Sequence, residues 1–298
     1  MTQGQKIKVL WEHLGLRDKT VVSSMAVSSV IVKRVVFKAR SPKELDQKIY
    51  EEAGQHIPND MKDVYLDYHA LGQGDKKDVV EVMLVAGKKK VVEELIRVMG
   101  DAELSLGMID VDAFALCNCF EFNYPELVSD SSCLVDIGET RSIFAIFRQS
   151  QPVFFREMSF GGRQLTDIIA RSLDVSRMEA EEIKIKGPSS QDNLKHLEIA
   201  KEIHSSVKSW AEEVKRLTGF YQTSNNQERQ PKNIFLSGGG SLFRGIDNVF
   251  QEHLGIETKH FDPWKGLQTS ITDFDYKYLD SIKPQLAIAT GLALRSII

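Results

Sequence analysis

The chain has 298 residues, 42% hydrophobic and 27% charged, which is enough for about two domains with hydrophobic cores. Its 38 basic and 42 acidic residues give a formal charge of −4, and no basic stripe is interleaved with aromatic residues, which argues against nucleic acid as the main partner. No apolar run reaches the roughly 18 residues of a membrane span, and residues 1–8 do not form a signal peptide. We therefore expect a cytoplasmic protein whose membrane association is only indirect, through partners.

The first part of the chain alternates helical and strand patterns. It opens with a helix whose apolar residues share one face, and a helix start of the Ser-Pro-Lys-Glu type follows at Ser41. The predicted strands are 21–37 (two strands), 63–71, 79–86 and 108–111, with a polar turn at 72–78 and a helix at 89–99. This block fits a small α/β insert. Such an insert is either purely structural or, because it has its own sheet, leaves an edge available to peptides.

The second part predicts a three-stranded meander that leads into helices. After an apolar helix at 113–120, the predicted elements are strands 133–137, 142–148 and 151–159, helices 163–172, 176–186 and 192–223, a loop at 222–232, a strand at 234–236 and a core helix at 286–298. Ser176 and Glu179 have the spacing of a capping box. This order is that of one half of an actin-like, ribonuclease-H-type nucleotide fold.

Two strands in this part run directly into glycine turns. Asp136 and Gly138 end the first, and Gly238–Gly240 follow the second, with Ser241 as the expected N-cap of a helix to about Leu254. Helix N-termini attract anions, and a carboxylate at a strand end can hold the water shell of Mg²⁺, so the two turns predict a phosphate pocket. The residues that a Rossmann fingerprint or a P-loop requires are absent, and the alternative is a pair of ordinary tight turns.

The three cysteines, at positions 117, 119 and 133, are expected to be buried free thiols, because no partner set of Cys or His lies nearby. The scattered histidines predict no zinc site.

Several motifs occur in the order of a known family. They are Leu134-Val-Asp-Ile-Gly, Phe160-Gly-Gly-Arg-Gln-Leu-Thr, Ala180-Glu-Glu-Ile-Lys, Leu236-Ser-Gly-Gly-Gly-Ser-Leu and Gly291-Leu-Ala-Leu-Arg. On these residues the chain strongly resembles the PilM type IV pilus assembly proteins, relatives of the cell-division protein FtsA, over nearly its whole length.

The resemblance implies an ATP site with Mg²⁺. Asp136, Gly138 and Thr140 match the second phosphate loop, with Asp136 linked to Mg²⁺ through water. The remaining matches are Gly161 and Gly162 at the border of the nucleotide cleft, Glu181 and Lys184 near the ribose and adenine, and Gly238, Gly239, Gly240 and Ser241 in the adenosine motif. On periodicity alone, Glu181 and Lys184 would belong to a solvated helix face.

The resemblance also implies an α/β, actin-like two-half fold. The expected first half is 1–130, with a partial 1A core and an FtsA-like 1C insert at about 28–103; the second is 131–298, with a 2A core at about 131–175 and 232–298 and a helical 2B at 176–231. The chain departs from the family at its start, where no Asp-x-Gly first phosphate loop occurs. We expect an N-terminally truncated first half, weakened ATP binding, little turnover, and a sheet edge that favours a homo-oligomer.

The implied function is that of a cytoplasmic adaptor at the inner membrane. In this family the groove between the insert and the first core subdomain receives the cytoplasmic N-terminal segment of PilN, which links the alignment complex to pilus motor components. ATP then serves as a structural or switching ligand. Two alternatives remain open: an active ATPase or phosphotransferase of the actin superfamily, and an FtsA-like filament former.

Overall fold

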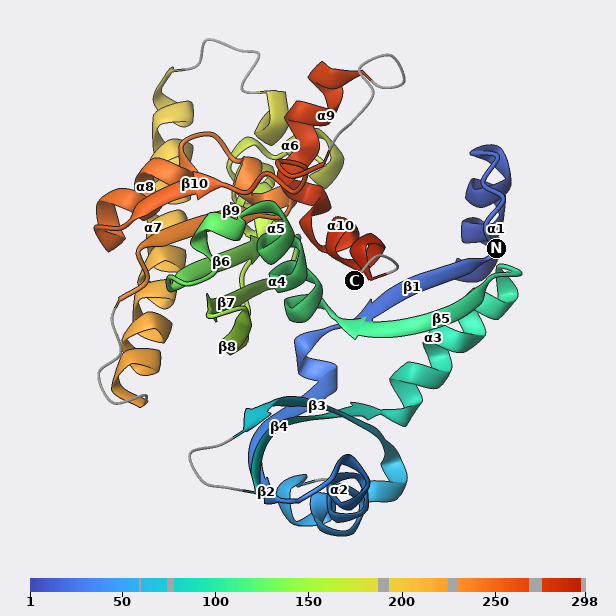
Figure 1. Cartoon of the computed structure of the whole chain (residues 1–298). Helices are drawn as coiled ribbons and strands as arrows, with labels where there is room; N and C mark the ends of the chain where they lie inside the picture. Colours follow the sequence, from blue (N-terminus) through green and yellow to red (C-terminus); the bar gives the residue numbers. More distant parts are fainter. Residues whose placement is uncertain (59, 74–77, 187–192, 225–229, 268–274, 296–298) are drawn as a thin grey trace. The chain divides into compact units, whose positions relative to one another are not determined.

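The computed structural model describes the chain except residues 59, 74–77, 187–192, 225–229, 268–274 and 296–298. It divides into two compact units, Met1–Asp112 and Ala113–Ile298. Each unit has its own sheets and hydrophobic clusters, so we describe each by itself (Figure 1).

The first unit contains two small sheets. A parallel pair consists of β1 (Thr20–Met25) and β5 (Ser105–Val111). An antiparallel sheet has the order β2 (Val30–Lys38), β4 (Val79–Lys88) and β3 (Val64–Gln73), which leaves β2 and β3 at its edges. The helices are α1 (Gln3–His13), α2 (Pro42–His56) and α3 (Lys89–Asp101).

Helix α2 packs on one face of the three-stranded sheet. Side chains alternate between the faces of a strand, and residues four apart share one face of a helix, so both elements present apolar rows. The buried residues of β4 on this face are Val82, Leu84 and Ala86, and those of α2 are Leu45, Ile49 and Ala53. Ser41 starts α2 as predicted, because its hydroxyl accepts a hydrogen bond from the Glu44 amide at 3.2 Å.

The predicted N-terminal helix is confirmed, but much of its apolar face remains exposed. Leu10 and Leu14 are 56% and 58% exposed. The close contact of α1 is made instead by Gly4, which is buried against Val98 and Asp101 of α3. A residue without a side chain thus brings the two helices together.

The second unit contains one five-stranded sheet with the order β10-β9-β6-β7-β8. The strands are β6 (Ser132–Ile137), β7 (Ser142–Arg148), β8 (Gln151–Met158), β9 (Asn233–Ser237) and β10 (Glu257–His260). β6, β9 and β10 are parallel, and β7 and β8 form the predicted antiparallel meander. The carboxyl ends of β6 and β9 therefore lie side by side, which is where parallel sheets bind ligands.

Helices cover both faces of this sheet (Figure 1). Their bounds are α4 (Asp112–Asn123), α5 (Gly162–Leu173), α6 (Arg177–Lys186), α7 (Asn193–Ser224), α8 (Ile246–Leu254), α9 (Tyr276–Ile282) and α10 (Ala287–Leu294). Val135 and Ile137 of β6 join the cluster formed with α5, α7 and α8, whereas Leu134 joins the cluster formed with α4 and α10. The strand period of two thus separates two hydrophobic layers.

The prediction that Ser241 caps a helix to Leu254 is wrong. Residues Gly239–Leu242 form a short 3₁₀ helix, and α8 begins only at Ile246. Gly238 and Gly245 have φ angles of +79° and +81°, a conformation that glycine adopts readily and that interrupts a regular helix on either side of Ser241. The anion site expected at the start of this helix is therefore not formed by Ser241.

The two compact units differ from the predicted halves, 1–130 and 131–298. Residues 113–130 belong to the second unit, because Leu116 and Phe120 of α4 pack with Leu134 and Phe235 of the sheet. Four other predicted segments lie partly outside the described residues: the turn 72–78, the start of the helix predicted for 192–223, the loop 222–232 and the end of the helix predicted for 286–298. The capping box at Ser176 and Glu179 is confirmed by reciprocal hydrogen bonds of 3.0 and 3.3 Å.

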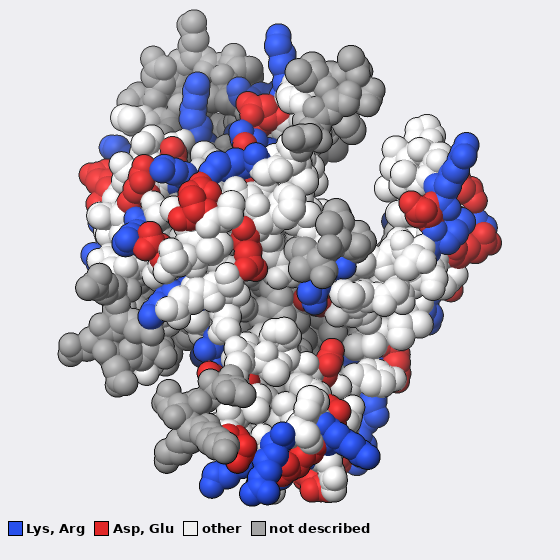
Figure 2. Space-filling view, in the orientation of Figure 1, with Lys and Arg blue, Asp and Glu red and all other residues white. Residues whose placement is uncertain are grey.

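Within the described part of the chain, no helix is sufficiently long and apolar to cross a lipid bilayer. Acidic and basic side chains are interspersed over the face that Figure 2 shows, as the nearly balanced composition predicts. The expected buried thiols are also confirmed, since all three cysteines are free and buried. Burial raises the pKa of the Cys119 thiol to about 12 and also raises that of Cys133, so these thiols are poor nucleophiles at neutral pH.

Two glycine substitutions should change stability in opposite directions. A Cβ at Gly291 of α10 would lie 1.8 Å from the Ala115 carbonyl oxygen, so Gly291→Ala should lower the free energy of unfolding by about 1–3 kcal/mol or more. Gly219 in α7 has open space around it, and Gly219→Ala should raise that free energy by about 0.5–1 kcal/mol. Urea unfolding of both variants tests this, and a neutral Gly291→Ala would contradict the α4–α10 packing.

Candidate functional site

Two polar side chains meet at the adjacent carboxyl ends of β6 and β9. Asp136 and Ser237 are register partners of the parallel pair and are 8% and 1% exposed. The Ser237 hydroxyl donates a hydrogen bond of 2.7 Å to Asp136 Oδ2. The carboxylate predicted from the sequence is therefore held in place by a serine that the sequence analysis did not select.

Glycines bring three backbone segments into contact beside Asp136. A Cβ on Gly240 would lie 2.5 Å from Ile137 Cγ2, and one on Gly161 would lie 2.5 Å from the Glu139 carbonyl oxygen. Gly162 lies close to Gly240, since its Cβ would be 3.5 Å from the Gly240 Cα. We call this set, Gly138, Gly161, Gly162, Gly238 and Gly240, the glycine junction. Its members permit close approach of backbone to backbone.

The β6–β7 turn closes the start of α5. The amides of Gly162 and Arg163 donate to the carbonyl oxygens of Gly138 and Glu139 at 2.9 and 2.8 Å. Arg163 also pairs with the Glu139 carboxylate, with Nε at 2.9 Å from Oε1. Because these first amides have protein acceptors, the N-terminus of α5 is a joint between elements and its first two amides are not available to an anion.

Gly239 differs from the other glycines of its turn. It is exposed, and the nearest atoms to a Cβ built there belong to Gln285, at 3.9 Å. The 3₁₀ helix Lys283–Leu286 that carries Gln285 is attached to the turn, because the Gly238 amide donates to the Pro284 carbonyl oxygen at 2.8 Å. Gly239 thus has room for a ligand to approach, and Gln285 stands beside it.

Ser241 and Thr140 occupy different positions at the site. The Ser241 hydroxyl is fully buried and donates to the Gly238 carbonyl oxygen at 2.7 Å, so it closes the turn. Thr140 is exposed in the turn between β6 and β7. The structure thus places Ser241 as a support of the turn, whereas Thr140 lies on its accessible side.

Glu181 and Lys184 on α6 form a network with Thr166 of α5 beside the glycine junction. Lys184 Nζ lies 2.8 Å from Glu181 Oε2, 2.9 Å from Thr166 Oγ1 and 3.3 Å from the Gly162 carbonyl oxygen. Thr166 Oγ1 also lies 2.5 Å from Glu181 Oε2. The predicted pair is therefore not a solvated helix face, since Lys184 reaches the backbone of the junction.

The network keeps the Glu181 carboxylate ionised. Partial burial raises the pKa of Glu181, but the hydrogen bonds from Lys184 and Thr166 together outweigh that effect, and the net result is a pKa below the usual value. The position beside Gly162 therefore carries an ionised acceptor at neutral pH.

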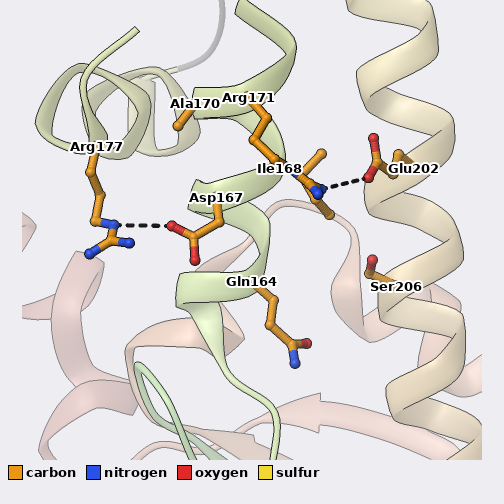
Figure 3. A pocket seen from close by; sticks show the side chains of 8 residues that line it. All are labelled: Gln164, Asp167, Ile168, Ala170, Arg171, Arg177, Glu202 and Ser206. Carbon is orange, nitrogen blue, oxygen red and sulfur yellow. Dashed lines mark hydrogen bonds and ion pairs between the residues drawn. The ribbon is translucent and has the colours of Figure 1, made fainter. Parts of the chain in front are cut away.

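A cavity of about 850 Å³ lies on the opposite face of α5 (Figure 3). Its lining residues Gln164, Ile168 and Arg171 have helical spacing and face away from Gly162 and Thr166. Two ion pairs of 3.0 Å cross it, Arg177 to Asp167 and Arg171 to Glu202 (Figure 3). These pairs connect α5 to α6 and α7, and all three helices line the cavity.

The residues present fit Mg²⁺ only together with phosphate. Within the described residues, no group of three or more His, Cys, Asp or Glu side chains could hold a metal. Asp136 supplies one carboxylate at the end of β6, and Mg²⁺ ordinarily combines one or two carboxylates with phosphate oxygens and water. A nucleotide would therefore have to supply part of the coordination.

The sequence analysis named most of the residues that the structure brings together. Its omissions are Thr166, which lies within the quoted Phe160–Thr166 motif, and Ser237 and Gln285. Ser237 could have been found from its place at a strand end beside the glycines. No local pattern identifies Gln285, because it reaches Gly239 from a distant part of the chain.

Known proteins resemble this chain over most of its length. A family model described as type IV pilus assembly protein PilM matches residues 3–297. A chain of the structure described as the PilM-PilN type IV pilus biogenesis complex aligns with a TM-score of 0.85 and 25% identity, over 99% of this chain and 85% of that chain.

A second solved structure supports the fold alone. MreB5 of Spiroplasma citri bound to ADP aligns with a TM-score of 0.53 and 12% identity, over 99% of this chain and 74% of that one. Together, these similarities confirm the expected α/β fold, which this chain shares with the PilM and MreB5 structures.

The glycine junction predicts a difference between two neighbouring substitutions. Gly240→Ala should lower the free energy of unfolding by about 1–3 kcal/mol, because its Cβ would meet both the side chain and the carbonyl oxygen of Ile137. Gly239→Ala should leave stability within about 0.5 kcal/mol of the wild type, since its Cβ would meet only the Gln285 side chain, at the ordinary contact distance of 3.9 Å. Thermal unfolding of the two variants measures this, and equal melting temperatures would refute the close approach at Gly240.

Proposed function

The chain belongs to the PilM family of type IV pilus assembly proteins, and we propose from this that it is a cytoplasmic adaptor at the inner membrane that binds the cytoplasmic N-terminal segment of PilN. We further propose that ATP, with Mg²⁺, is a structural or switching ligand held by the second unit. The observation that carries the nucleotide proposal is the convergence of Asp136, the glycine junction and the Glu181–Lys184 pair at one edge of the sheet.

Asp136, Thr140 and Gly239 would serve the phosphate side of the nucleotide. Asp136 stands at the end of β6, next to the turn that carries Thr140, and could orient the water shell of Mg²⁺. Gly239 supplies an exposed backbone without a side chain. Glu181 would serve the nucleoside side, because an ionised carboxylate accepts hydrogen bonds from hydroxyl groups and repels phosphate.

Binding of this kind can control an adaptor without catalysis. A ligand shifts a conformational equilibrium by its difference in affinity for the two states, so no hydrolysis is needed. The candidate site connects β6, β9, α5 and α6, and a nucleotide that bridged these elements would favour the conformation in which they are close. We propose that this conformation is the one competent for the partner.

The insert of the first unit supports a peptide-binding role. β3 is an edge strand of the three-stranded sheet, and in the described part of the chain no strand pairs with its outer side. Tyr65 on β3 is 48% exposed and pairs with Gly87, and a Cβ at Gly87 would lie 3.3 Å from Met25 Sδ at the end of β1. Tyr65 therefore marks the end of the insert that adjoins the β1–β5 sheet.

Titration calorimetry with Mg-ATP tests the nucleotide proposal. The wild-type chain should bind ATP, and Asp136→Asn should weaken binding about tenfold or more, because the neutral amide no longer attracts hydrated Mg²⁺. Gly239→Ala should also weaken it. Glu252→Gln, at an exposed position of α8, removes one negative charge away from the site and should bind as the wild type does.

Phosphate release in the same samples separates the adaptor from the enzyme alternative. Binding without release supports a structural or switching ligand, whereas release that disappears in Asp136→Asn would favour an ATPase. If the wild-type chain does not bind ATP at all, the nucleotide part of the proposal is wrong.

Fluorescence anisotropy with a labelled peptide tests the partner. A peptide with the cytoplasmic N-terminal sequence of PilN should bind saturably, and a scrambled peptide should not. Tyr65→Ala should weaken binding about tenfold, as expected for loss of an aromatic contact. Tyr276→Ala, which removes a similarly exposed ring in the second unit (42% exposed), is the matched control. Equal effects of the two substitutions would exclude this end of the insert.

A further inference from the structure

We propose that Thr166 and Lys184 are positioning residues for Glu181, and that they hold one of its carboxylate oxygens so that the other accepts a hydrogen bond from a sugar hydroxyl of the bound nucleotide. The inference rests on the proposed nucleotide function and deepens it. It assigns a role to Thr166, and it places Lys184 behind Glu181 instead of in direct contact with the ligand.

Lys184 has no donor left for a ligand in this arrangement. An ammonium group carries three N–H donors and no acceptor. Three protein oxygens lie within hydrogen-bond distance of Nζ: Glu181 Oε2, Thr166 Oγ1 and the Gly162 carbonyl oxygen. The Lys184 side chain is also only 13% exposed. A direct contact with the nucleotide would require Lys184 to give up one of these bonds.

Thr166 connects Lys184 to Glu181 through hydrogen bonds. Thr166 is only 1% exposed, so its hydroxyl can act only through its neighbours. The oxygen accepts from Lys184 at 2.9 Å, and the single proton is donated at 2.5 Å to Glu181 Oε2 or at 3.2 Å to the Gly162 carbonyl oxygen. The shorter distance and the negative charge of the carboxylate favour Glu181.

Glu181 is thereby left with one engaged oxygen and one available oxygen. Oε2 receives hydrogen bonds from both Thr166 and Lys184, and within the described residues Oε1 has no hydrogen-bond partner. The Glu181 side chain is 45% exposed, so a ligand can reach it. An ionised carboxylate only accepts hydrogen bonds, so the group that it recognises must be a donor. On ATP this excludes the phosphates and leaves two kinds of donor, the ribose hydroxyls and the adenine 6-amino group, which the deoxy analogues below distinguish.

Three substitutions, one control variant and three nucleotides test the assignment by titration calorimetry. Thr166→Val removes the hydroxyl at nearly constant volume, Thr166→Ser restores it, and Lys184→Met removes the ammonium. Each protein is titrated with Mg-ATP and with 3′-deoxy-ATP, and 2′-deoxy-ATP is used in a parallel series. Asp167→Asn is the control, because it breaks another α5–α6 contact, the ion pair with Arg177, and leaves the network intact.

The wild type should bind ATP about tenfold more tightly than at least one deoxy analogue. Thr166→Val and Lys184→Met should bind ATP about tenfold more weakly and lose that preference, whereas Thr166→Ser and Asp167→Asn should keep both properties. Circular dichroism melts verify that each variant is folded, and if Thr166→Val does not fold, Lys184→Met with Thr166→Ser decides the question.

Several results would overturn the inference alone. If Thr166→Val or Lys184→Met binds ATP as the wild type does, the network does not position Glu181. The same conclusion follows if either variant binds ATP more weakly but keeps the preference for ATP over the deoxy analogue. A wild type that binds ATP and both deoxy analogues equally well has the same meaning. If the wild type binds none of these nucleotides, the proposed nucleotide function fails and this inference fails with it.

Discussion

The candidate site depends on the close approach of backbone segments at the ends of β6 and β9. Gly240 lies against Ile137, and Gly161 lies against the carbonyl oxygen of Glu139. A Cβ atom at either glycine would be only 2.5 Å from these neighbours, so any larger residue would force the segments apart. Dense packing of this kind transmits small displacements, because a close-packed interior does not deform continuously. The turn after β6, the turn after β9 and the start of α5 are therefore constrained as one assembly.

This constraint extends to α6 through hydrogen bonds. Lys184 reaches the carbonyl oxygen of Gly162, and Thr166 connects the same lysine to Glu181. One residue further along α5, the ion pair between Asp167 and Arg177 joins the same two helices. A ligand that changes the position of Glu181 therefore acts on α5 as well as on α6. For an adaptor, such a connection between a ligand and helix positions is sufficient, because the partner needs only to distinguish two conformations.

The residues of the site divide into those that support its shape and those that remain accessible. Gly238, Gly240 and Ser241 are explained by contacts within the protein, since they make or close the turn after β9. Asp136, buried beside Ser237, has the chemistry of a metal-linked carboxylate, whereas Gly239 is exposed and Glu181 is partly exposed. The glycine motif after β9 thus contains packed positions, which shape the turn, and one exposed position, Gly239, which a ligand can contact directly.

The sequence by itself determined strands β6 to β9 of the second unit, the capped starts of α2 and α6, the buried thiols and most of the residues that meet at the candidate site, because periodicity, caps and turn residues are local signals. It failed for the segment after β9, where Gly238 and Gly245 interrupt the expected helix at Ser241. Only the tertiary structure decided that 113–130 packs with the second unit, that Ser237 holds Asp136, and that Gln285 stands beside Gly239. These contacts join residues far apart in the chain, and no local pattern specifies which distant side chain will fill a given position.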